Sequence, residues 1–90
     1  MDVKAKVQEL TGSAEYLTIK WRRYKSCQAW IGTIGDYSLI KSYKTIVGLV
    51  DDENRKFYEL GKYSRTTSRQ MTRIYNDLYP FCEREFVGKE

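Results

Sequence analysis

The sequence contains no histidine, and this absence excludes several kinds of active site. Histidine is the usual general base near neutral pH, the commonest zinc ligand and the standard partner of a nucleophilic serine or cysteine. A phosphate-binding loop is also missing, because Gly61 and Lys62 have neither the earlier glycine nor the following serine or threonine that such a loop needs. We therefore expect a binding protein that is not an enzyme and that uses no cofactor.

Cysteine and long apolar runs are scarce as well. The two cysteines, Cys27 and Cys82, lie far apart without a CxxC spacing, so we expect reduced thiols. The N-terminal segment has no apolar core followed by a small-residue cleavage site, and no apolar run is long enough to cross a bilayer. These features predict a soluble protein of the cytoplasm, without a membrane partner.

Carboxylates are dispersed except at Asp51, Asp52 and Glu53, which Asn54 follows. Asp and Asn side chains commonly bond to the backbone of a turn, whereas a calcium site needs ligands spread over a longer loop with a glycine. The cluster therefore predicts a hairpin turn and no metal site.

The chain has 90 residues, of which 41% are hydrophobic and 31% charged, with a formal net charge of +4. This length fits one domain, residues 1–90, with a modest core. Alternation of apolar and polar residues, or a run of β-branched and aromatic residues, predicts strands within residues 3–60. They are placed at residues 3–10, 16–22, 28–34 (where Gly32 indicates a bulge or a close approach), 44–50 and 55–60.

Residues 67–79 carry a different period, with apolar residues three and four apart, which predicts a helix. Thr67 and Gln70 have the spacing of a capping box, and Pro80 marks the end. A tail of residues 81–90 follows. The expected fold is α+β, a small antiparallel sheet of about four to five strands with one C-terminal helix packed on it. The expected core comprises Leu17, Ile19, Trp21, Ile46, Val47, Met71, Ile74 and Leu78.

Two groups of cations are candidate binding sites. The first lies at the end of the strand at residues 16–22 and comprises Arg22, Arg23, Tyr24 and Lys25. Cations interleaved with aromatic rings can pair with phosphates and stack on bases. A solvated strand end is the structural alternative. Alternation places Tyr24 on the outward face, as a stacking or interface ring.

The second group precedes and enters the helix and comprises Lys62, Arg65, Arg69 and Arg73. If the helix extends back to residue 65, the three arginines are spaced by four residues and form one column. Free backbone N–H groups at the helix start add to an anion site. The structural alternative is a capped helix with a solvated face. We expect Arg69 and Arg73 to contribute most to binding.

Two motifs carry a resemblance to a known group of proteins. Residues 42–47 read SYKTIV and residues 63–69 read YSRTTSR, on either side of the predicted hairpin. This pair, covering about residues 42–75, resembles motifs in short uncharacterised proteins of phages and mobile elements of Gram-positive bacteria. Related sequences often have histidine where this chain has Gln70, a departure that argues against a role for an imidazole.

The resemblance implies an inhibitor of a host defence machine, such as a CRISPR effector nuclease, that occludes a functional surface. It would be anti-CRISPR-like in kind and act in the host cytoplasm on a protein or nucleoprotein complex. The alternative, direct DNA or RNA binding, comes from the +4 charge and the two cation groups. An oligomeric structural protein is a third alternative, and the sequence leaves the oligomeric state open.

Overall fold

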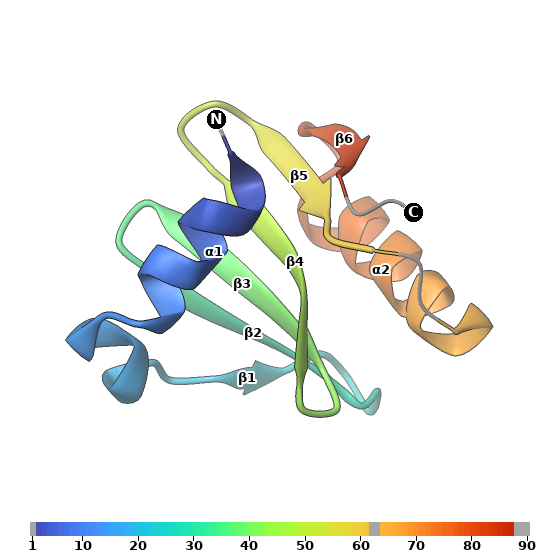
Figure 1. The fold of residues 1–90 in the computed structure, drawn as a ribbon. Helices are drawn as coiled ribbons and strands as arrows, with labels where there is room; N and C mark the ends of the chain where they lie inside the picture. Colours follow the sequence, from blue (N-terminus) through green and yellow to red (C-terminus); the bar gives the residue numbers. More distant parts are fainter. Residues whose placement is uncertain (1, 62–63, 88–90) are drawn as a thin grey trace.

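A six-stranded sheet with helices on both faces forms the centre of the protein (Figure 1). The computed structural model describes residues 2–61 and 64–87. The strands follow one another in the sheet in sequence order. They are β1 (Arg22–Arg23), β2 (Ala29–Ile34), β3 (Tyr37–Ser42), β4 (Thr45–Asp51), β5 (Lys56–Glu59) and β6 (Glu83–Phe86). The helices are α1 (Val3–Thr11), the short 3₁₀ helix η1 (Ala14–Thr18) and α2 (Arg65–Leu78). The α+β class with a C-terminal helix is confirmed, with more strands than expected.

The predicted hairpin around the acidic cluster is confirmed as β4 and β5. Asp51 is buried, and its carboxylate accepts hydrogen bonds from the backbone N–H of Asn54 at 3.2 Å and from the Asn54 side chain at 2.8 Å. The cluster thus serves the turn, as its composition predicts.

The last strand pairs in parallel with β5, whereas all the other pairs are antiparallel. A parallel neighbour needs a crossover connection, and α2 provides it between β5 and β6. The sequence patterns predicted no strand in the C-terminal tail and none at β3. The turn signal Gly35-Asp36 before an apolar run was the available indication of β3.

The first strand prediction, residues 3–10, is wrong, because this segment is helix α1. Val3 and Val7 fit a period of two but are also four residues apart, as on one face of a helix. Asp2 favours the helix, since its carboxylate accepts a hydrogen bond from the Ala5 N–H at 3.1 Å, as an N-cap does.

The second strand prediction, residues 16–22, is largely wrong as well. Residues 14–18 form η1, Leu17 is 85% exposed rather than buried, and only the two residues of β1 pair with β2. The inward positions Ile19 and Trp21 are half-buried and lie against Gly32 of β2. A Cβ atom on Gly32 would clash with Ile19 and lie 2.9 Å from the Trp21 ring, which confirms the close approach predicted at this glycine.

Helix α2 begins earlier than the capping-box spacing indicates. Ser64 is its N-cap and accepts a hydrogen bond from the Thr67 N–H at 3.2 Å. Thr67 and Gln70 instead face the sheet, where the Ser42 hydroxyl donates to the Gln70 amide oxygen at 3.1 Å and lies 3.4 Å from the Thr67 hydroxyl. The helix ends at Leu78, two residues before the proline, as predicted.

Each face of the sheet carries its own apolar cluster, because strands β3 to β5 are covered on both sides (Figure 1). On one face, Met71 and Ile74 of α2 pack on a cluster that includes Ile40, Val47, Val50 and Phe57. On the other face, Val3 of α1 packs on Ile34, Leu39, Leu49 and Tyr58.

The predicted core is confirmed at Val47, Met71 and Ile74. Ile19, Trp21 and Ile46 are only half-buried. Leu78, which was also expected in the core, is 44% exposed because it lies in the last turn of α2. Cys27 and Cys82 are both free thiols in the structure.

Candidate functional site

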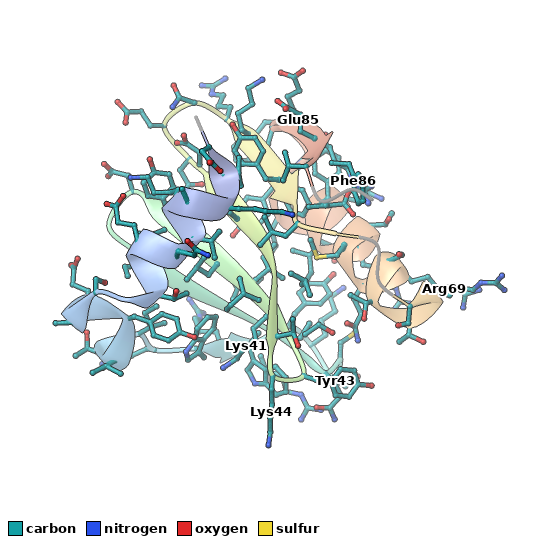
Figure 2. All side chains as sticks on the ribbon, in the orientation of Figure 1. Lys41, Tyr43, Lys44, Arg69, Glu85 and Phe86 are labelled. Carbon is teal, nitrogen blue, oxygen red and sulfur yellow. The ribbon has the colours of Figure 1, made fainter. Side chains whose placement is uncertain are left out.

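Three segments that are distant in sequence meet at one end of the sheet. We call this region the loop end; it comprises the β1–β2 loop (residues 24–28), the β3–β4 turn (residues 43–44) and residues 64–73 of the α2 cap and helix. The Tyr43 N–H donates to the Gln28 carbonyl oxygen at 2.9 Å, which joins the turn to the loop. The buried hydrogen bond from Ser42 to Gln70 joins the turn to α2. Figure 2 shows Tyr43, Lys44 and Arg69 around this end.

The arginine column predicted on the C-terminal helix is present at the loop end. Because α2 starts at residue 65, Arg65, Arg69 and Arg73 are spaced by four residues on one helix, and all three are exposed. Within residues 2–61 and 64–87, none of these arginines forms an ion pair. They line an open hollow of about 540 Å³ that Cys27 of the β1–β2 loop also borders. Lys62, the fourth member predicted for this group, lies outside the described residues.

Tyr24 does not have the outward position expected from strand alternation. It is 6% exposed, and its hydroxyl donates to the Asp77 carboxylate and lies 3.4 Å from the Arg73 carbonyl oxygen. Burial, then the hydrogen bond with Asp77, raises the pKa of Tyr24 above its usual value. The prediction of a stacking ring is therefore wrong. The prediction failed because strand alternation ends at Arg23, the last residue of β1. Tyr24 instead holds the β1–β2 loop against α2 through its hydrogen bond to Asp77.

Lys25 also ties the loop to α2, through an ion pair with Asp77 at 3.0 Å. Hydrogen bonds from Tyr24 and then Lys25 lower the pKa of Asp77, since both favour the ionised carboxylate. These contacts hold the β1–β2 loop against α2. Tyr24 and Lys25 of the strand-end group thus lie next to α2, which carries the arginine column.

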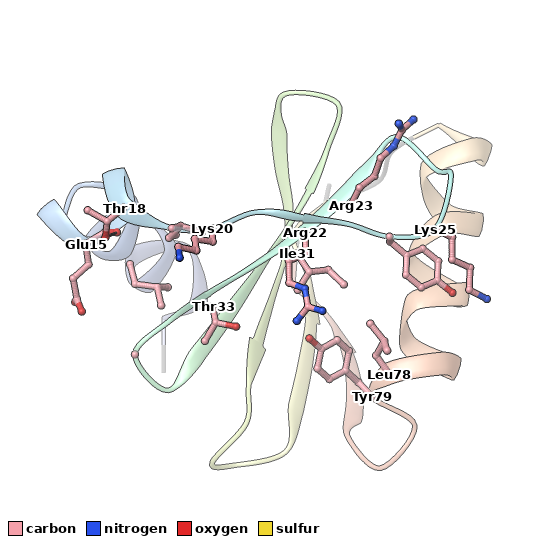
Figure 3. A pocket seen from close by; sticks show the side chains of 14 residues that line it. Glu15, Thr18, Lys20, Arg22, Arg23, Lys25, Ile31, Thr33, Leu78 and Tyr79 are labelled. Carbon is pink, nitrogen blue, oxygen red and sulfur yellow. Dashed lines mark hydrogen bonds between the residues drawn. The ribbon is translucent and has the colours of Figure 1, made fainter.

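The side chains of Arg22 and Arg23 point to opposite faces of the sheet, because the two residues are neighbours in β1. Arg22 lies opposite Ile31 in the register of β1 with β2, and Arg23 lies opposite Trp30. Figure 3 shows Arg22 extending over a cleft of about 760 Å³ near Ile31, Leu78 and Tyr79. Arg23, Tyr24 and Lys25 also border this cleft, so all four residues of the strand-end group meet at one surface, although alternation directs the Arg23 side chain to the face that α1 covers elsewhere.

Sequence reasoning missed three residues near the loop end. Lys41 is the second-last residue of β3 and lies opposite Trp30 of β2, and Tyr43 and Lys44 form the β3–β4 turn. Tyr43 is 58% exposed, and its φ angle of +56° is typical of a residue in a tight turn. An accurate prediction of β3 would have identified Tyr43 and Lys44 as turn residues.

Acidic residues lie at the other end of the sheet. Asp36 is in the β2–β3 turn and Asp51 to Glu53 end β4 and begin its turn, with the Asp52 N–H donating to the Asp36 carbonyl oxygen at 3.4 Å. Burial, followed by repulsion from Asp51 and Asp36, raises the pKa of Asp52. These carboxylates therefore lie in turns at the end of the sheet away from the loop end.

Two features are absent from residues 2–61 and 64–87. No three side chains of the metal-binding types (His, Cys, Asp or Glu) gather closely enough there to hold a metal ion. Over the same residues, no helix has the length and apolar character needed to span a membrane.

The fold and site define a small α+β domain with a helix-borne arginine column at one end of a six-stranded sheet. The chain belongs to the Family of unknown function (DUF8033), whose pattern it matches over residues 5–87. No curated protein and no solved structure matches it.

Proposed function

We propose that the chain is a non-enzymatic binding protein that contacts nucleic acid through the loop end. The observation that carries the proposal is the exposed column of Arg65, Arg69 and Arg73, which forms no ion pair within the described residues. When arginine side chains without a protein partner bind phosphates, they displace the counterions that are condensed on the nucleic acid. This release of counterions supplies much of the affinity for nucleic acid.

The packing of α2 on the sheet favours a binding role for the arginine column over the alternative that it is only a solvated helix face. Met71 and Ile74 are 1% and 0% exposed, and Gln70 is held by the buried hydrogen bond from Ser42. The helix therefore presents its arginines from a fixed backbone, so that binding restricts fewer degrees of freedom. The net charge of +4 and the remote position of the acidic turns act in the same direction.

The test is a double charge reversal, Arg69→Glu with Arg73→Glu, assayed by fluorescence anisotropy with a labelled oligonucleotide. We expect binding to weaken by at least ~1–3 kcal/mol. We also expect the slope of log K against log salt to become shallower by about 0.9 for each duplex phosphate that the variant no longer neutralises, or about 1.8 for two phosphates.

The matched control is Lys4→Glu with Arg55→Glu, an equal change of charge on exposed residues of α1 and of the β4–β5 turn. Circular dichroism of both variants must match that of the wild type. Equal losses of affinity in the two variants would show that only net charge matters, and wild-type binding by the Arg69/Arg73 variant would refute the assignment.

A second function is proposed from the motif resemblance and from the cleft that Arg22 borders. It is inhibition of a host defence machine, such as a CRISPR effector nuclease, by a phage or mobile-element protein in the host cytoplasm. The cleft of about 760 Å³ combines apolar side chains, Ile31 and Leu78, with the cations Lys20 and Arg22. Apolar anchors with a charged rim are typical of protein interfaces.

Affinity capture from host lysate, with and without nuclease treatment, separates the two functions. A protein that stays bound after nuclease treatment, and that is released by Leu78→Asp but not by the Arg69/Arg73 double change, would support the inhibitor. Leu78 is 44% exposed, so this substitution spares the core. Capture that disappears with nuclease would favour direct nucleic-acid binding.

A further inference from the structure

Rings and cations alternate across three strands on the sheet face opposite α2. In the strand register Arg23 lies opposite Trp30, and Trp30 lies opposite Lys41. The Arg23 guanidinium is 5.7 Å from the centroid of the Trp30 ring, and the Lys41 ammonium is 4.2 Å from that of Trp21. We call these four residues, Arg23, Trp30, Lys41 and Trp21, the Trp ladder.

Trp30 is the member of the ladder that the hydrophobic core does not explain. It is only half-buried, and neither apolar cluster of the described residues includes it, although Trp21 packs at the edge of one of them. Helix α1 covers the part of this face around Leu39 and Leu49 (Figure 1). A large ring in contact with water and a cation is a feature of binding surfaces, where tryptophan is enriched.

The cation beside Trp30 is held in place by the β1–β2 loop. Arg23 Nε donates to the Cys27 carbonyl oxygen at 2.8 Å, and a terminal guanidinium nitrogen of Arg23 donates to the Ser26 carbonyl oxygen at 3.4 Å. Because Cys27 also borders the hollow lined by Arg69, this loop connects the ladder to the arginine column. Tyr43, whose ring is exposed, lies in the turn that follows β3, and its backbone N–H donates to the Gln28 carbonyl oxygen of the same loop.

We propose that the Trp ladder is a platform for nucleobases and that the preferred ligand is therefore single-stranded nucleic acid. The proposal rests on nucleic-acid binding at the loop end and adds the form of the ligand. Aromatic rings stack on any base, whereas the bases of a duplex are stacked on one another and do not present their faces. Trp30 and Tyr43 would stack on bases, while Arg23, Lys41 and the arginine column would bind the phosphates between them.

The wild-type protein provides the first measurement. Trp21 and Trp30 are the two tryptophans of the chain, so intrinsic tryptophan fluorescence reports on the ladder alone. We expect a thymidine oligonucleotide of about 12 nucleotides to quench this fluorescence, since one OB-type site covers ~4–16 nucleotides. A duplex of equal length should bind at least about tenfold more weakly and quench less.

Two substitutions of one residue provide the second measurement. Trp30→Leu keeps an apolar side chain but removes the stacking surface, and we expect it to weaken single-strand binding by about 5- to 150-fold. Trp30→Phe should restore most of the affinity. The control is Phe81→Leu, a similar change at a ring that is 59% exposed beyond the far end of α2, and it should bind like the wild type.

The outcomes separate this inference from the proposed function. Equal affinity of the wild type for single strand and duplex would overturn the ladder but leave nucleic-acid binding intact, and so would a folded Trp30→Leu variant that binds like the wild type. Two results together would overturn base stacking and leave only a phosphate-binding site. Inorganic polyphosphate would compete fully with the oligonucleotide, and neither of the two ligands would quench the tryptophan fluorescence. A failure to bind either nucleic acid at low salt would refute both proposals. If Trp30→Leu does not fold, the wild-type preference decides.

Discussion

Truncation of Ile74 to alanine is expected to destabilise the fold strongly, whereas the same truncation at Leu78 is not. Both residues belong to the apolar stripe of α2, but Ile74 is 0% exposed and Leu78 is 44% exposed. Removal of a fully buried aliphatic side chain costs about 2–5 kcal/mol, since a cavity adds to the forfeited transfer free energy. Full burial of a leucine side chain stabilises a fold by ~1.5–3 kcal/mol. Because Leu78 is only about half buried, Leu78→Ala should cost about 1 kcal/mol.

Urea denaturation followed by circular dichroism measures this difference. With a slope of about 1 kcal/mol per molar urea for a small domain, Ile74→Ala should lower the midpoint by about 2 M or more, and Leu78→Ala by about 1 M or less. Ile74→Val, with an expected cost of about 0.5–1.5 kcal/mol, remains measurable if the alanine variant does not fold. Equal shifts for the two alanine variants would contradict the difference in burial between Ile74 and Leu78.

Three further predictions concern packing and titration. Gly32→Ala should destabilise the fold by about 1–3 kcal/mol in urea denaturation, because its new methyl group meets the segment before β1; an unchanged midpoint would contradict that close approach. Ser42→Ala should cost about 1–3 kcal/mol, since Gln70 would keep a buried amide oxygen without its donor, and a neutral effect would argue against this hydrogen bond. Hydrogen bonds from Tyr24 and then from Lys25 hold the pKa of Asp77 below its usual value near 4. The ionised Asp77 carboxylate therefore contributes its full stabilisation above pH about 4, and this stabilisation is lost as the pH falls through the lowered pKa. The stability difference between the wild type and Asp77→Asn should therefore shrink on acidification, and a difference that is constant down to pH about 2 would refute the assignment.

The candidate site was partly predictable because some of its features are local. The spacing of Arg65, Arg69 and Arg73 follows from the sequence once a helix is predicted there. The error at Tyr24 arose because alternation was continued beyond a strand that ends at Arg23. Strand pairing is decided by partners distant in the chain, and a two-residue strand leaves no periodic signal of where it stops.

Short-range signals in the chain were enough to define two elements: the β4–β5 hairpin around its acidic turn, and the amphipathic helix before Pro80. Val3 and Val7 fit both a strand and a helix, and an N-terminal cap together with packing on the sheet selected the helix. Three-dimensional packing alone brought the β1–β2 loop, the β3–β4 turn and the start of α2 to one end of the sheet. This difference arises because capping and periodicity act over a few residues, whereas the sheet order and the buried hydrogen bond between Ser42 and Gln70 join residues far apart in the chain.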